Sequence, residues 1–201
     1  MSKETSDLVL GGVILVVLIP VLYAVARAIG TIGDTWSVHI LAPLAPSIGG
    51  TVDRAHPCIK GRYQDRDIRI SFTPDQSVGA DESATSINAF YIDVMDLAGR
   101  QDWRIRFYPS GLLGQGPNQL YIEVEDKALG ERLDRSGVLD SVSTVSSPTQ
   151  GYVTVQYEAR RQTLTYTDDV SPRQIPSHEQ FAAQLELVAR LAEVNAQVNP
   201  L

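Results

Sequence analysis

The sequence has few of the residues that carry redox or metal chemistry. Cys58 is its only cysteine, so no disulfide bond can form within the chain, which favours a reducing compartment. It has 3 histidines, and neither they nor the pair His56 and Cys58 form the set of about four ligands that zinc takes. His39 alone is weak evidence for a haem ligand, and no C-x-x-C-H motif occurs. The sequence therefore predicts no bound metal or cofactor.

Positive charge is also scarce. The chain has 17 Lys and Arg residues against 24 Asp and Glu residues, which gives a formal net charge of −7. The charges within residues 1–30 cancel, so the whole acidic excess belongs to the remainder of the chain. Because such a field repels nucleic acid and anionic headgroups at long range, we expect no nucleic-acid partner. A basic protein partner, or solubility alone, fits this charge better.

Motifs of catalysis and phosphate binding are missing as well. Residues 111–116 read GLLGQG, which is neither G-x-G-x-x-G nor a Walker motif, and Pro117 stands where a helix N-terminus would be needed. Two acidic groups have no accompanying histidine or serine nucleophile, and we interpret them as surface charge. These groups are Asp93, Asp96 and Asp102, and Glu123, Glu125 and Asp126. We therefore expect a protein that is not an enzyme.

Charged side chains are absent altogether from residues 8–26, which read LVLGGVILVVLIPVLYAVA. As a helix, residues 8–29 would be about 33 Å long, against a hydrocarbon core of about 30 Å. Arg27 near the end of this run would place its charge among the headgroups. The sequence predicts a single-pass membrane protein that contacts the lipid bilayer through residues 8–29.

A cleaved signal peptide is the alternative interpretation, because residues 24–26 read AVA, which resembles a cleavage site. Against it, residues 1–7 are not basic, and the apolar run is longer than the roughly 7–15 residues of a signal peptide. Lys3 and Arg27 flank the run on opposite sides and fix no orientation. The lone cysteine leads us to expect the folded domain on the cytoplasmic side.

The sequence divides into three parts: residues 1–30, the transmembrane anchor; residues 31–57, a membrane-proximal helix and connector; and residues 58–201, a soluble α+β domain. In the second part, Asp34 or Thr35 could cap a helix that prolines keep short. Its apolar face would consist of Trp36, Ile40, Leu41 and Leu44.

Hydrophobic residues alternate with polar ones over much of residues 59–167, which predicts β-strands with one buried face. The alternating segments are 68–72, 90–94, 103–107, 120–124, 153–157 and 164–166. Burial of one face favours an antiparallel sheet, since strands of parallel sheets are apolar throughout. Residues 127–133 are expected to form a short helix between strands.

A long amphipathic helix is predicted at the C-terminus, where Ser177 can cap it and Gln180 completes a capping box. It carries two apolar stripes, the first of Phe181, Leu185, Val188 and Ala192, and the second of Leu187, Leu191, Val194 and Val198. One stripe is expected to pack on the sheet, and the other either on the first short helix or against a helix of another protein. The predicted fold class is therefore α+β: one N-terminal transmembrane helix, then a mostly antiparallel β-sheet domain packed by a C-terminal α-helix.

Arg69, Arg104 and Arg106 fall on the polar face of strands that are expected to be adjacent or near one another. With Arg100 they would form a basic patch inside an acidic domain. Such a patch can contact an anion, a lipid headgroup or an acidic partner. Alternatively, these arginines belong to a solvated face and pair with nearby carboxylates, namely Asp65, Asp67, Asp93 and Asp102.

Short phrases of the sequence carry a resemblance. They are LAPSIG at residues 44–49, G-x-Y-x-x-R at Gly61, Tyr63 and Arg66, and GLLG at residues 111–114. In this order, with the first phrase ending a Trp-containing helix and a C-terminal helix following the last, they resemble a loose class of uncharacterised bacterial membrane-anchored proteins. The resemblance covers residues 36–194 and implies no activity.

The single anchor, the second apolar stripe and the lack of active-site motifs favour a non-catalytic accessory subunit of a larger membrane assembly, such as a respiratory, photosynthetic or transport complex. Its partners would be other membrane protein subunits. The alternative is a membrane-anchored binding or sensory module for a small anion or lipid headgroup, which would use the arginine face.

Overall fold

The structure is a computed structural model that describes residues 21, 38–53, 56, 58–75, 87–108, 119–137, 142, 145, 153–170 and 176–201. Apart from Val21, the anchor predicted for residues 8–29 lies outside the described residues, as do Trp36, the capping residues before it and the loop at 111–116. Among the residues that the structure does describe, no helix combines the length and the hydropathy needed to pass through a bilayer.

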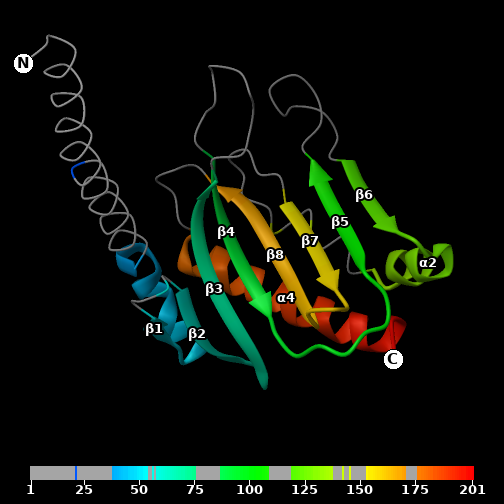
Figure 1. Cartoon of the computed structure of the whole chain (residues 1–201), viewed down its shortest axis with the longest axis horizontal. Coiled ribbons are helices and arrows are strands. Elements are labelled where there is room, and N and C mark those ends of the chain that lie inside the picture. The colour runs from blue at the N-terminus through cyan, green and yellow to red at the C-terminus, as the bar shows by residue number, and fades with distance from the viewer. Residues whose placement is uncertain are drawn as a thin grey trace, which may run out of the picture.

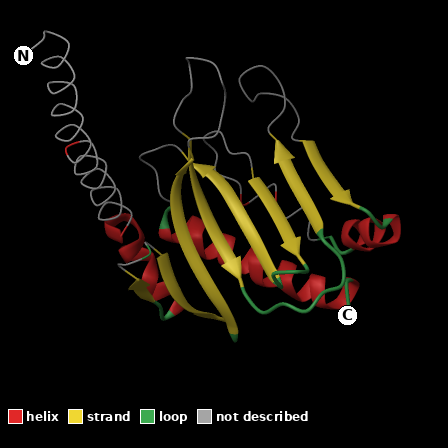
Figure 2. Ribbon diagram, in the orientation of Figure 1, coloured by secondary structure: helices red, strands yellow, loops and turns green. Residues whose placement is uncertain are grey.

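The described residues form an α+β domain, as the sequence predicts (Figure 2). In chain order the elements are the 3-10 helix η1 (Ala42–Ile48), β1 (Thr51–Asp53), β2 (Cys58–Tyr63), β3 (Arg66–Asp75), β4 (Ile87–Val94), β5 (Trp103–Tyr108), β6 (Gln119–Val124), α2 (Lys127–Arg135), β7 (Val153–Glu158), β8 (Thr163–Val170) and α4 (His178–Val198). The N-cap expected at Ser177 is confirmed, because its hydroxyl oxygen accepts the Gln180 N–H at 3.2 Å. Leu41 and Leu44 of the expected short helix are buried.

The strands form an 8-stranded sheet in the order β1-β2-β3-β4-β8-β7-β5-β6, and every pair of neighbours is antiparallel. The mostly antiparallel sheet expected from one-sided alternation is therefore confirmed. β8 lies between β4 and β7, so the chain leaves β4 through residues 95–102, passes the ends of β8 and β7, and enters β5 (Figure 1). We call residues 95–102 the connector.

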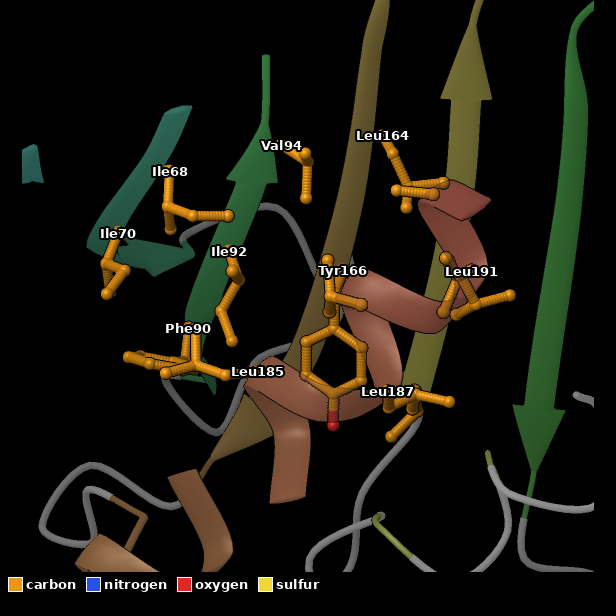
Figure 3. Packing of buried hydrophobic residues seen from close by; sticks show 14 of the residues in the cluster. Ile68, Ile70, Phe90, Ile92, Val94, Leu164, Tyr166, Leu185, Leu187 and Leu191 are labelled. Carbon is orange, nitrogen blue, oxygen red and sulfur yellow. The ribbon is translucent and has the colours of Figure 1, made fainter. Parts of the chain in front are cut away.

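The core lies between the sheet and α4 (Figure 3). One fully buried row crosses neighbouring strands as Ile70, Ile92, Tyr166, Val155 and Ile105. α4 packs on this side of the sheet and adds side chains from both of its apolar stripes. The rings of Phe181 on α4 and Phe90 on β4 pack edge to face, with centroids 6.1 Å apart and planes at 78°. The apolar residues of the alternating segments thus bury one face of the sheet.

The connector is fastened to the C-terminal end of α4 by two asparagines. Asn199 Oδ1 accepts the Arg100 N–H at 3.2 Å, and Asn195 Nδ2 donates to the Ala98 carbonyl at 3.1 Å. These bonds satisfy backbone groups that the long crossing between β4 and β5 would otherwise leave without strand partners. The C-terminal end of α4 therefore holds in place the connection between β4 and β5.

The β2–β3 hairpin is tied to the same helix. Gln64 and Asp65 form its turn with φ values of 48° and 62°, the left-handed conformation that a two-residue hairpin turn requires. Gln64 Nε2 donates to Glu186 Oε2 at 2.9 Å, and the Tyr63 hydroxyl donates to the same oxygen at 3.1 Å. α4 therefore contacts both the β2–β3 hairpin and the connector.

Candidate functional site: the open face of the sheet

α4 covers one face of the sheet, and no helix among the described residues lies on the other, which faces the viewer in Figure 1. We call this second face the open face. Directly opposed residues of antiparallel strands project to the same side, so the register identifies its members. One row crosses the sheet as Lys60, Arg69, Asp93, Thr165, Gln156, Arg104 and Glu123. A second row contains Tyr91, Thr167, Thr154, Arg106 and Tyr121.

Arg69 and Asp93 form the first ion pair of the open face. Arg69 donates to Asp93 Oδ2 from Nε at 2.9 Å and from Nη2 at 2.6 Å, and the Thr165 hydroxyl donates to Oδ1 at 2.8 Å. The Asp93 residue is only 5% exposed, so these donors replace the water that its carboxylate loses on burial. This pair is one that the solvated-face interpretation of the arginines predicted.

Arg104 and Arg106 form a second group around a single carboxylate. Arg106 Nε lies 3.2 Å from Glu123 Oε1, and Arg104 Nη1 lies 3.7 Å from Glu123 Oε2. Arg104 Nε also donates to Gln156 Oε1 at 3.1 Å, while Gln156 Nε2 donates to Glu158 Oε1 at 2.9 Å. The polar side chains of β6, β5 and β7 are therefore linked across the face.

The strand order corrects the expected basic patch. β4, β8 and β7 lie between the strand of Arg69 and the strand of Arg104, which puts the two arginines about 19 Å apart at the usual strand spacing. Arg100 lies in the connector, outside the strands. These arginines were predicted to lie together because the alternation of residues shows which face of the sheet each occupies. It does not show the order of the strands.

The sequence leaves two alternatives open for the second apolar stripe of α4, and the structure shows the stripe packed within the domain. Leu187 is 3% exposed, Leu191 is fully buried and Val194 is 8% exposed, and Val198 packs partly buried against the same core. α4 contacts η1 and α2 in addition to the sheet. These side chains therefore pack within the domain and have too little exposed surface to bind a partner helix.

The residues weighed as metal ligands lie apart. Cys58 is buried in β2, and burial, as the largest cause, raises the pKa of its thiol. The His56 side chain is 86% exposed and its Nδ1 lies 3.9 Å from Asp53 Oδ2. Among the described residues, no group of three or more His, Cys, Asp or Glu side chains is arranged to hold a metal ion.

Members of the two acidic groups make structural hydrogen bonds. Asp126 is the N-cap of α2 and accepts the Ala128 N–H at 2.8 Å. Asp102 Oδ1 accepts the Ala159 N–H at 2.7 Å and so joins the connector to the β7–β8 turn. These carboxylates hold backbone groups in place.

A buried polar cluster in the core was missed by sequence reasoning. Tyr166, Asp168 and Gln184 are each fully buried. Gln184 Nε2 donates to Asp168 Oδ2 at 3.0 Å and to the Tyr166 hydroxyl oxygen at 3.3 Å. Burial, followed by the charge of Asp168, raises the pKa of Tyr166 well above its ordinary value, so the phenol stays neutral. The available signal was Gln184 itself, a polar residue between Phe181 and Val188 on the apolar side of the helix.

These features define an α+β domain whose antiparallel sheet has α4 on one face and polar rows on the other. Neither a protein-family model nor a curated protein matches the sequence. Among solved structures, the chain is similar to the crystal structure of the mycobacterial trehalose monomycolate transport factor A, TtfA. The TM-score is 0.45 and the identity 12%, over 72% of this chain and 73% of that chain. A likeness at this level carries no argument about function.

Proposed function

We propose that this chain is a non-catalytic accessory subunit of a larger membrane protein complex, anchored through residues 8–29, and that the open face of its sheet binds a neighbouring subunit. The observation that carries the proposal is the one-sided sheet. Its apolar side is buried by α4, while its polar side is ordered into rows without a helix of the described chain upon it.

The size of the open face supports a macromolecular partner. At the usual spacing an eight-stranded sheet is about 34 Å wide, and strands of six residues are about 20 Å long. The face therefore offers roughly 700 Å², close to the about 800 Å² that one partner buries in a standard protein interface. A small anion would use only a fraction of this area.

The pairing of the arginines also favours a protein partner over a free anion. Arg69 contacts Asp93, and Arg104 and Arg106 both contact Glu123. An incoming anion would have to compete with these carboxylates for the guanidinium groups. A protein surface can instead add hydrogen bonds at the rim of each pair and leave the pairs intact.

A photoreactive amino acid at position Thr154, in the middle of the open face, tests the proposal in the full chain purified in mild detergent. We expect a covalent adduct with one defined membrane protein. The matched control is a photoreactive residue at the exposed Glu193 on α4, which should give no such adduct. Equal adducts from both positions, or no adduct from Thr154 with another membrane protein, would count against it.

The alternative is a module for a small anion or lipid headgroup at Arg104 and Arg106. It predicts that inorganic phosphate, or vesicles with anionic headgroups, bind the chain and that the R106Q variant weakens this binding at least about tenfold. Arg62, whose Nε lies 3.3 Å from Asp67 on the hairpin, supplies the matched R62Q control. Binding that depends on Arg106 would replace the accessory-subunit proposal.

A further inference from the structure

The two edges of the sheet are built differently. β6 (Gln119–Val124) pairs with β5 along its whole length, from Tyr108↔Gln119 to Trp103↔Val124, without a bulge. At the opposite edge, β1 has only 3 residues, and its Asp53 is tied to Lys60 at 3.1 Å. An edge strand presents backbone N–H and C=O groups to any strand that can align with it. The β6 edge is long enough to pair, and the β1 edge is not.

The sequence of β6 also lacks the residues that normally block edge pairing. Its sequence QLYIEV contains no proline, glycine or lysine. Its single charged residue, Glu123, is directed to the open face, where it contacts Arg106 at 3.2 Å. Leu120, Ile122 and Val124 on the core side are only partly buried. A strand added at this edge would cover apolar surface that the chain itself leaves partly exposed.

Tyr121 is an exposed aromatic residue on this edge strand. It is 49% exposed, and among the described residues the other large hydrophobic side chains at such exposure are Val21 and the C-terminal Leu201. Aromatic residues that stand exposed on a folded domain are common at protein interfaces. Tyr121 therefore gives the edge an apolar anchor beside its backbone groups.

We propose that β6 pairs antiparallel with β6 of a second copy of this chain, around a twofold axis at Tyr121, so that one continuous sheet runs through both protomers. Tyr121 then opposes Tyr121 of the second copy, Leu120 opposes Ile122, and Gln119 opposes Glu123. Opposed residues keep the same face, so the apolar row and the polar row both continue across the axis.

Charge selects this register over the neighbouring one. With the axis at Tyr121, the two Glu123 residues are offset by four positions, or about 14 Å along the strands. With the axis at Ile122 the offset falls to about 7 Å, which brings two like charges together. Both registers preserve the faces, but only the first separates the carboxylates.

The short β1 edge limits the assembly to two copies. A filament needs two different complementary edges, and β1 cannot extend a six-residue pairing. A twofold contact uses β6 twice and closes. Because it uses the edge and leaves the open face uncovered, the dimer does not depend on the proposed function.

A cysteine at Tyr121 tests the contact in the full chain in detergent. Directly opposed residues of antiparallel strands have Cα atoms about 4.5–5.5 Å apart, within the range of a disulfide bond. We expect the Y121C variant to form a covalent dimer on mild oxidation. The matched control is E123C, on the same strand and face, which should form no covalent dimer because its two thiols would lie about 14 Å apart along the strands. The unsubstituted chain, whose Cys58 is 5% exposed, measures the background.

Light scattering supplies a second measurement. The unsubstituted chain should have twice the mass of one protomer, and Y121K, which opposes two ammonium groups across the axis, should weaken dimerisation at least about tenfold. A cooperative unfolding transition would show that Y121K is folded. A monomer at every concentration, or a covalent dimer of E123C in place of Y121C, would overturn the proposal.

Discussion

The indole N–H of Trp103 donates a 2.8 Å hydrogen bond to Oδ1 of Asn195, which joins the first residue of β5 to the last turns of α4. Both residues are buried, at 2% and 0% exposure. The same Asn195 Oδ1 accepts from Asn199 Nδ2 at 3.1 Å. One amide oxygen thus holds together the helix end and the strand that follows the connector.

Removing this amide should destabilise the fold. In N195A the buried Trp103 N–H loses its partner, which costs about 1–3 kcal/mol, and the Ala98 carbonyl loses its hydrogen bond to Asn195 Nδ2. We expect the free energy of unfolding in urea to fall by at least about 2 kcal/mol. E193A, at an exposed position of the same helix, should change it by less than about 0.5 kcal/mol. Equal values for the two variants would contradict the structural role of Asn195.

A methyl group at Gly99 should be poorly tolerated. A Cβ there would lie 2.7 Å from ring atoms of Tyr157, whose hydroxyl donates to the Leu97 carbonyl at 2.8 Å and cannot move without losing that bond. We expect G99A to lower the free energy of unfolding by about 1–3 kcal/mol. G130A is the control, since its Cβ meets only a Val124 methyl group at 3.1 Å and α2 gains helix propensity.

The hairpin turn can be improved. Asp65 adopts φ 62°, where a Cβ is strained, and its carbonyl rather than its side chain accepts from Arg62 Nη2 at 3.0 Å. D65G should therefore raise the free energy of unfolding by roughly 0.5–1 kcal/mol. D67G, inside β3 with ordinary strand geometry, should lower it. A loss of stability in D65G would show that the turn differs from the one described.

The stability of the domain should decrease at alkaline pH. Burial raises the pKa of Tyr166 well above its ordinary value of about 10, and the pKa values of Tyr63 and Tyr157 are raised for the same first cause. Above pH about 10 the unfolded chain loses these protons while the folded chain keeps them, so the free energy of unfolding falls as pH rises. Titration from pH 8 to 11 should show a shallower slope for Y166F. An unchanged slope in Y166F would show that Tyr166 does not contribute to the loss of stability at alkaline pH.

Breaking the Arg69–Asp93 pair should cost more than breaking an exposed pair. In R69A the Asp93 carboxylate, 5% exposed, keeps the Thr165 hydroxyl as a donor and loses the guanidinium. We expect a loss of about 1–3 kcal/mol in the free energy of unfolding. R62A removes a pair whose side chains are 66% and 62% exposed and should cost less than about 0.5 kcal/mol. A similar cost in both variants would mean that the burial of Asp93 is unimportant.

The sequence predicted the strands well because each carries a strict period of two. Segments 68–72, 90–94 and 103–107 all lie within strands, with their apolar residues buried. The helix expected at 127–133 and the capped C-terminal helix are also confirmed. β1 and β2 lie outside the six predicted segments, and the three residues of β1 are too few to show a period.

The strand order and the buried polar residues could not be predicted in the same way. Pairing between β4 and β8 joins residues far apart in the chain, and alternation carries no information about it. For the same reason the sequence placed Arg69 near Arg104. Gln184 and Asn195 were overlooked because polar residues on a helix are usually exposed, and their partners lie on strands whose positions were unknown.

The position of β8 between β4 and β7 affects how the protein is made. Strands β1 to β4 form one group and β5 to β7 another, and β8 is the strand through which they touch. A ribosome releases residues 163–170 after both groups, so each group has an unpaired strand edge in the nascent chain until β8 is made. The sheet therefore becomes continuous only once β8 has paired with both groups.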